Sequence, residues 1–128
     1  MKNVIATFVL TAFAALSMQA QTVTGKWKTI DDETGKAKSI VEISEKNGKI
    51  YGKVVEILTD KKDAKCDKCP GADKGKPIKG LTIIKGLSKD GKEYSGGTIT
   101  DPSSGKEYKC ALKLNGSDKL DVRGYVGI

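Results

Sequence analysis

The stretch SIVEISEKNGKIYGKVVEIL, residues 39–58, decides the fold. It holds two runs rich in β-branched residues, Ser39–Glu45 and Lys49–Leu58, with Asn47-Gly48 between them. Val, Ile and Tyr favour strands, and Asn-Gly between two such runs is typical of a tight hairpin turn because both residues tolerate positive φ. The stretch therefore predicts an antiparallel β-hairpin.

Short strand-like runs separated by turn residues continue on both sides of this hairpin. Asp31–Gly35, Ser88–Gly91 and Asp101–Gly105 are the clearest turns. Seven strands are expected in all, at Thr24–Ile30, Ser39–Glu45, Lys49–Leu58, Leu81–Leu87, Glu93–Thr100, Lys106–Leu114 and Lys119–Val126. The sequence thus predicts an all-β antiparallel meander, which closes into a barrel or sandwich because open edges invite aggregation.

Composition limits the chemistry. The chain has 128 residues, which suits one domain, and it contains no histidine. The commonest general base, the commonest zinc ligand and any Ser-His or Cys-His nucleophile pair are therefore absent. The carboxylates form no recognisable acid–base pair by spacing, so we predict no catalytic residue, metal site or cofactor, and expect that the protein is not an enzyme.

The net charge of +7 comes almost entirely from lysine, since Arg123 is the sole arginine, and aromatic residues make up only 5%. Arginine is preferred for recognising phosphates and bases, and aromatics are needed for stacking on bases. Nucleic acid is therefore not an expected partner. Solubility, or weak attraction to anionic envelope polymers, explains the charge.

Residues 1–20 have the pattern of a secretory signal peptide. Lys2 gives a positive start, Val4–Leu16 is almost wholly apolar, and small residues lead to Ala20. The apolar run is too short for a comfortable transmembrane helix. We therefore expect a signal peptide at residues 1–20 and a single exported domain at residues 21–128, periplasmic or extracellular, with no integral membrane span after signal removal.

One segment, Thr59–Gly80, breaks the strand pattern. Its 22 residues include seven lysines and four aspartates. So long a connection in a small domain is typical of a lid or binding loop, or of a solvated excursion held by a disulfide. The second interpretation is favoured, because loops are polar by default.

Several motifs fall in a fixed order along the chain. They are GKPIKGL at 75–81, GGTITDP at 96–102, GKEY at 105–108 and LDVRGYVG at 120–127. Together they resemble the exported bacterial family catalogued as domain of unknown function 2147, over essentially the whole mature chain. Gly25-Lys26-Trp27 is similar to the Gly-x-Trp signature of lipocalin-like (calycin) barrels. The resemblance implies a lipocalin-like barrel of the cell envelope with no established activity.

The resemblance also implies an eighth strand. Family members continue beyond the strand at Lys119–Val126 into one more strand, whereas this sequence stops at Ile128. In calycin-like barrels a basic side chain near the last strand packs over the first-strand tryptophan, here Trp27. With the last strand missing, the first and seventh strands have unpaired edges, which predicts self-association through those edges.

Three cysteines, Cys66, Cys69 and Cys110, are the disulfide candidates. Pro70 and Gly71 indicate a loop after Cys66-x-x-Cys69, whereas a thioredoxin-like pair needs a helix start. Zinc would need a fourth ligand from among the carboxylates. A disulfide is therefore the expected fate in an exported protein, ahead of zinc and redox catalysis.

Strand register suggests which cysteines pair. A five-residue loop, Asp101–Gly105, would place Gly96 opposite an inward-facing Cys110. Because Gly96 leaves room for another segment, we predict that Cys66 or Cys69 bonds to Cys110. The rival is a local Cys66–Cys69 bridge, with Cys110 as a buried inert thiol.

Alternation on the last strand separates Leu120 and Val122 from Asp121, Arg123 and Tyr125. The apolar pair is expected to face the interior, so the other three face solvent. The reverse arrangement would place Arg123 in the cavity as an anion anchor.

These features favour a non-catalytic barrel that binds a small apolar molecule or lipid, because small barrels hold ligands in their mouths. The candidate ligand-binding residues are Trp27, Tyr51, Tyr94 and Tyr108. The alternative is a structural or interaction protein with a filled barrel and a lysine-rich loop that contacts anionic envelope components. An interior cavity distinguishes the first function from the second.

Overall fold

The computed structural model describes residues 2–6, 23–31 and 33–126. It confirms the all-β prediction, and each of the seven expected runs forms a strand whose ends lie within three residues of the predicted ones. The strands are β2 (Gly25–Ile30), β3 (Ala37–Lys46), β4 (Lys49–Ile57), β5 (Thr82–Asp90), β6 (Glu93–Thr100), β7 (Glu107–Asn115) and β8 (Lys119–Tyr125). In this described part, the 3-10 turn η1 (Gly71–Asp73) is the only helical element, and no helix is long and apolar enough to span a membrane.

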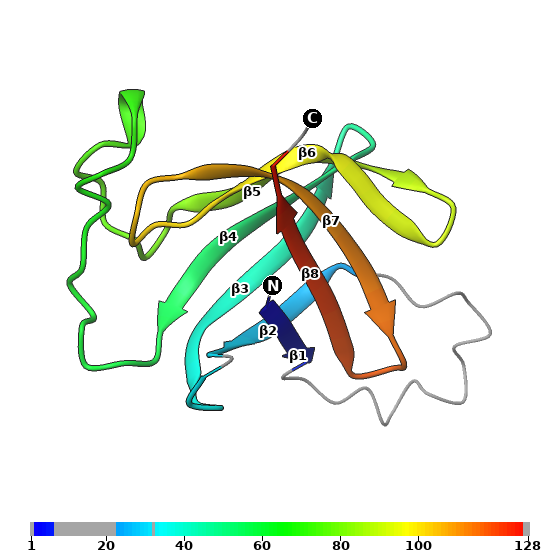
Figure 1. Cartoon of the computed structure of the whole chain (residues 1–128), viewed down its shortest axis with the longest axis horizontal. Helices are drawn as coiled ribbons and strands as arrows, with labels where there is room; N and C mark the ends of the chain where they lie inside the picture. The colour runs from blue at the N-terminus through cyan, green and yellow to red at the C-terminus, as the bar shows by residue number, and fades with distance from the viewer. Residues whose placement is uncertain (1, 7–22, 32, 127–128) are drawn as a thin grey trace.

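Strands β2 to β8 pair antiparallel in chain order and curve into a nearly closed barrel (Figure 1). A further strand, β1 (Lys2–Ala6), lies between β8 and β2 and completes the ring. Val4 is paired with Thr29 of β2 and with Leu120 of β8. In the full chain the first and seventh predicted strands therefore have paired edges, because an N-terminal segment pairs with both, and the unpaired edges expected for residues 21–128 alone stay a prediction. The other residues of the predicted signal peptide, 1 and 7–20, lie outside the described residues.

The β3–β4 hairpin has the turn that its sequence predicts. Asn47 and Gly48 both have positive φ, 55° and 79°, and Lys46 pairs with Lys49 across the turn. Two central residues in the left-handed region match the right-handed twist of the flanking strands. The Asn-Gly dipeptide therefore sets the register of β3 against β4.

The β6–β7 register differs by one residue from the prediction. Gly97, rather than Gly96, lies opposite Cys110, and Thr100 lies opposite Glu107. The reason is the turn, which spans six residues and closes through a 2.9 Å hydrogen bond from the Asp101 N–H to the Lys106 carbonyl. Gly97 does permit a close approach, but the neighbour is β5, since a Cβ at Gly97 would overlap the Lys85 carbonyl oxygen.

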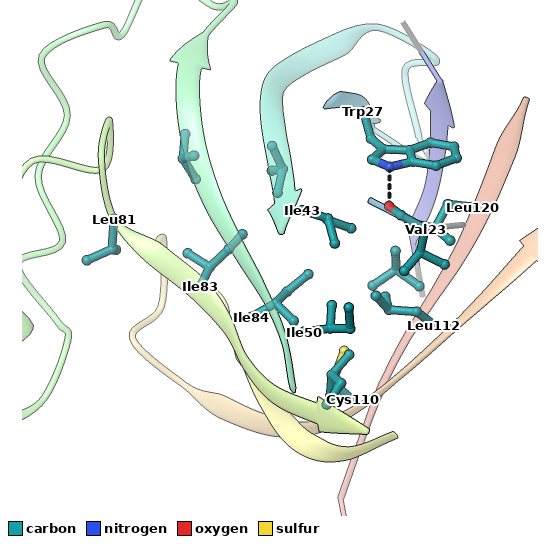
Figure 2. Packing of buried hydrophobic residues seen from close by; sticks show 14 of the residues in the cluster. Val23, Trp27, Ile43, Ile50, Leu81, Ile83, Ile84, Cys110, Leu112 and Leu120 are labelled. Atoms are coloured by element: carbon teal, nitrogen blue, oxygen red, sulfur yellow. Dashed lines mark hydrogen bonds between the residues drawn. The ribbon is translucent and has the colours of Figure 1, made fainter. Parts of the chain in front are cut away.

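Buried apolar side chains form one cluster inside the barrel, part of which Figure 2 shows, and this cluster includes the end where the β3–β4, β5–β6 and β7–β8 hairpins turn. Leu112 and Leu120 are fully buried there, and Trp27 is 2% exposed. The Trp27 indole N–H donates a 2.9 Å hydrogen bond to the Val23 carbonyl, which satisfies its polar atom without water. These buried side chains close this end of the barrel and form its floor.

The segment between β4 and β5 has no strand, as predicted, apart from an isolated bridge between Lys65 and Pro77. A disulfide joins Cys66 to Cys69, and Cys110 is free and buried. The prediction of a bond to Cys110 is therefore wrong. Cys110 faces the packed floor from mid-β7, whereas the cysteine pair folds back on itself at the barrel rim.

The connection between β4 and β5, residues 58–81, is called the cysteine segment here. It is fixed against the barrel through the β6–β7 turn. The Cys66 sulfur lies 3.3 Å from the Pro102 carbonyl oxygen, and the Lys68 backbone touches Gly105 closely enough that a Cβ at Gly105 would overlap the Lys68 carbonyl. Figure 1 shows the green segment beside this turn. Two loops far apart in sequence therefore form one continuous rim.

Candidate ligand-binding cavity

The barrel encloses a cavity of about 580 Å³ at the end opposite the packed floor. Its rim is made where β2, β4, β6 and β8 end and β3, β5 and β7 begin. Ligand pockets in proteins commonly measure about 300–1,000 Å³. The cavity is therefore large enough for a small organic molecule or a single acyl chain.

The inner wall of the cavity is apolar. Alternation along each strand places about one residue in two inside the barrel, and around the cavity most of these positions carry aliphatic or aromatic side chains. The deep lining consists of Trp27, Val41, Ile43, Val54, Ile83, Ile84, Leu120 and Val122. Such a wall offers a ligand apolar contact and little hydrogen bonding.

Polar groups gather at the mouth of the cavity. The hydroxyls of Thr29 and Ser39 lie 2.7 Å apart on the wall between β2 and β3. Lys38, half-buried at the start of β3, and Lys61, exposed in the β4–β5 segment, also line the cavity. The site is therefore graded, with an apolar interior and a polar, cationic entrance.

The cysteine segment builds one side of the mouth, contributing Thr59, Lys61, Ala64 and Ile78. Beyond the mouth, Asp73 holds the segment to β5 through an ion pair with Lys85 (3.4 Å), and it forms a second ion pair with Lys76 (3.2 Å) within the segment. The hydrogen bond from Lys76 lowers the pKa of the Asp73 carboxyl most, and the hydrogen bond from Lys85 lowers it further. The disulfide and these contacts fix the entrance in place.

The four predicted aromatic site residues divide into two pairs. Trp27 and Tyr108 line the cavity, whereas Tyr51 and Tyr94 do not. Tyr94 packs against the buried core, and Tyr51 is half-buried on β4, one residue away from the inward-facing Gly52. Alternation turns Tyr51 away from the interior, whereas Tyr94 lies opposite the buried Leu112 at the packed end, and residue type alone shows neither position.

Sequence reasoning did not identify the lysines at the mouth or the aliphatic wall. Strand alternation would have placed Val41, Ile43 and Val54 inside the barrel. Nothing in the sequence distinguishes Lys38 and Lys61 from the other lysines, because the loop conformation brings them to the cavity.

The orientation predicted for β8 is confirmed. Leu120 and Val122 are buried, and Val122 lines the cavity. Arg123 lies on the outer face with its guanidinium 5.3 Å from the centre of the Tyr125 ring, which is close enough for a cation–π contact. Arg123 is therefore not an anion anchor inside the barrel.

The Cys110 thiol is not available for surface chemistry. It is fully buried, and burial raises its pKa to about 12. Within the described ranges, no three Cys, Asp or Glu side chains come together in a way that could hold a metal ion. Cys110 is a core residue.

An antiparallel barrel wound in chain order, with one end packed and an apolar cavity at the other, defines a lipocalin-like protein. A solved structure described as "Protein HP1028 from the human pathogen Helicobacter pylori belongs to the lipocalin family" is similar, with a TM-score of 0.71 and 25% identity. The alignment covers 85% of this chain and 80% of that one.

The family described as "Uncharacterized protein conserved in bacteria (DUF2147)" matches residues 25–128, and the chain belongs to that family. The family and barrel predicted from the sequence motifs are thereby confirmed. A comparison with curated proteins gave no match.

Proposed function

We propose that the protein binds a small apolar molecule or a lipid inside its barrel, and that it acts by binding rather than by catalysis. The observation that carries this proposal is the cavity of about 580 Å³ with an aliphatic and aromatic wall. Transfer of an apolar ligand from water into such a space is favourable by roughly 25 cal/mol per Å² of buried apolar surface. The solved neighbour described as a member of the lipocalin family supports the same interpretation.

The cavity also weighs against the alternative of a filled barrel. A barrel filled with side chains along its whole length would leave no such space, whereas here the buried side chains at the rim end, such as Ile57 and Ile83, stand around a cavity. The lysine-rich segment forms part of the cavity mouth and is not an isolated surface feature. Binding is therefore the function that the arrangement supports best.

The proposal includes export to the periplasm or the extracellular space. Its support is the signal-like pattern of residues 1–20 and the Cys66–Cys69 disulfide, since disulfides persist in oxidising compartments. Fractionation of cells that express the full chain, with the mass of the recovered protein, tests this part. Recovery from the cytoplasm at full-length mass would contradict it.

Binding is testable with the neutral fluorophore N-phenylnaphthylamine, using energy transfer from Trp27, the sole tryptophan. Trp27 lines the cavity, so a bound probe lies within transfer distance. We expect saturable binding with one probe per barrel.

Val54→Phe provides the test of location, because Val54 lines the cavity and a phenyl ring would occupy ligand space. We expect probe affinity to fall at least about tenfold. Val55→Phe is the matched control, since the neighbouring Val55 lies on β4 but does not line the cavity. Far-ultraviolet circular dichroism checks that both variants fold. Equal affinity in the two folded variants would overturn the proposed site.

A further inference from the structure

Two ammonium groups border the cavity mouth. Lys38 and Lys61 reach it from different elements, the start of β3 and the β4–β5 segment. Neither mouth lysine takes part in the ion pairs that Asp73 forms with Lys76 and Lys85. A third ammonium group, that of Lys62, lies at the end of β4, where it donates a 2.8 Å hydrogen bond to the carbonyl of Ile57, a residue that lines the cavity.

One carboxylate, Asp101, lines the same cavity. Its Oδ1 accepts hydrogen bonds from the Ser103 N–H (3.0 Å) and the Ser103 hydroxyl (2.7 Å), so it serves to hold the β6–β7 turn. On the β2–β3 side, Asp31 caps the backbone N–H groups of Glu33 and Thr34 and does not line the cavity. The mouth therefore carries two cations and one turn-forming carboxylate.

The neutral polar groups at the mouth favour the same kind of ligand. The hydroxyls of Thr29 and Ser39 bond to each other on the wall, and the side chains below them are aliphatic or aromatic. A ligand head group therefore meets hydroxyls and ammonium groups at the entrance, whereas its remainder meets only apolar surface. Because charged groups are costly to bury without partners, the charged part of a ligand belongs at the mouth.

We propose that the ligand is an anionic amphiphile with a single apolar chain, an inference that rests on the proposed binding function. The chain extends toward Trp27, and the anionic head, a carboxylate or a phosphate monoester, lies between Lys38 and Lys61. A neutral apolar molecule would leave both ammonium groups unused, and a cationic one would be repelled.

The test compares three ligands that share a dodecyl chain: dodecanoate, dodecyl phosphate and dodecanol. Each is titrated into the full-length protein at about 0.1 M salt, where the Debye length is about 10 Å, with calorimetry or Trp27 fluorescence as the readout. The double variant Lys38→Gln/Lys61→Gln removes both mouth cations. The double variant Lys46→Gln/Lys92→Gln removes two exposed lysines at the packed end and makes the same change in net charge.

We expect the mouth variant to raise the Kd of one or both anionic ligands about three- to tenfold, since two partly solvated ion pairs are lost. The Kd of dodecanol should change less than about twofold. The packed-end variant should leave all three values near those of the unmodified protein, because exposed charges beyond a Debye length are screened. A larger loss for dodecanoate than for dodecyl phosphate, or the reverse, identifies the head group.

Two other outcomes separate this inference from the function on which it rests. If all three ligands bind and the mouth variant weakens none selectively, the barrel binds apolar molecules but the anionic head group is wrong. If neither the dodecyl ligands nor N-phenylnaphthylamine bind the folded protein, the proposed function itself fails. Equal losses in the two lysine variants would assign the effect to net charge and would overturn the mouth site.

Discussion

Cys110 lies on β7 opposite Gly97, with its sulfur in the packed end of the barrel and its thiol fully buried. Because burial raises its pKa to about 12, we expect no reaction with iodoacetamide at pH 8 in the native state. Mass spectrometry after labelling should show no adduct in native buffer and one adduct in denaturant without reductant. A native adduct would contradict the buried position, and three adducts in denaturant would contradict the disulfide.

The same thiol makes the free energy of unfolding depend on pH in the alkaline range. The pKa of Cys110 is about 12 in the folded chain and 9.0 in the reference state, so unfolding releases a proton between these values. The free energy of unfolding should therefore fall as pH rises above about 9, with this contribution fully present below it. Urea titrations of the unmodified protein and of Cys110→Ala measure it. An identical pH dependence in the two proteins would rule out the contribution.

Gly105 is a second residue with a specific role, because it has φ of +73° and lies against the Lys68 backbone. Gly105→Ala adds a Cβ to a left-handed residue and pushes it into the Lys68 carbonyl. Gly116→Ala is the matched control, since Gly116 has φ of +76° and open space around its Cβ position. We expect a loss of about 1 kcal/mol at Gly116 and a larger loss at Gly105, measured by urea unfolding. Equal losses would show that the two loops do not touch.

At the scale of elements, the β3–β4 hairpin depends on its Asn-Gly turn. Gly48 has φ of 79° in open surroundings, so Gly48→Val is disfavoured by backbone strain alone. A β-branched residue resists this region, and we expect a loss of about 1 kcal/mol or more in the free energy of unfolding. Gly48→Asn should cost less, because Asn tolerates this conformation and the preceding Asn47 already adopts it at 55°. A neutral Gly48→Val would show that the turn forms elsewhere.

The strands were predictable because alternation and turn residues are local properties. Asn47-Gly48 and Asp101–Gly105 mark hairpins in the sequence itself, and the strand ends follow from them. The register of β6 against β7 was not predictable to one residue. It depends on whether Lys106 belongs to the turn or to the strand, and the hydrogen bond from Asp101 to Lys106 decides this only in the folded chain.

The residues that form the rim of the cavity could not be predicted from local sequence patterns. The disulfide partner of Cys66 depends on where the cysteine segment lies, and that segment rests on the β6–β7 turn through Gly105 and Pro102. The choice of Lys38 and Lys61 among many lysines depends on the same placement. Trp27 and Tyr108 line the cavity, but residue type selected them together with Tyr51 and Tyr94, and only the strand positions in the folded barrel separate the two pairs.

At the scale of the whole molecule, closure of the barrel depends on a segment with two roles. Lys2–Ala6 lies within the stretch expected to act as a signal peptide, and in the structure it forms the strand between β8 and β2. Lys2 pairs with Val122 and Ala6 pairs with Trp27, so β1 runs from the cavity mouth toward the packed end. The family match begins at residue 25 and so does not include this strand.

Cleavage after Ala20 would remove β1 and leave β2 and β8 with unpaired backbone groups along facing edges. Exposed strand edges pair with other chains, so a protein comprising residues 21–128 should associate as its concentration rises. The full-length chain, with both edges paired to β1, should stay monomeric under the same conditions. Size-exclusion chromatography with light scattering at neutral pH, over a hundredfold range of concentration, compares the two forms. If the shortened protein stays monomeric throughout, β2 and β8 must pair with each other or be covered by another part of the chain. In that case β1 is not required to protect the edges of β2 and β8.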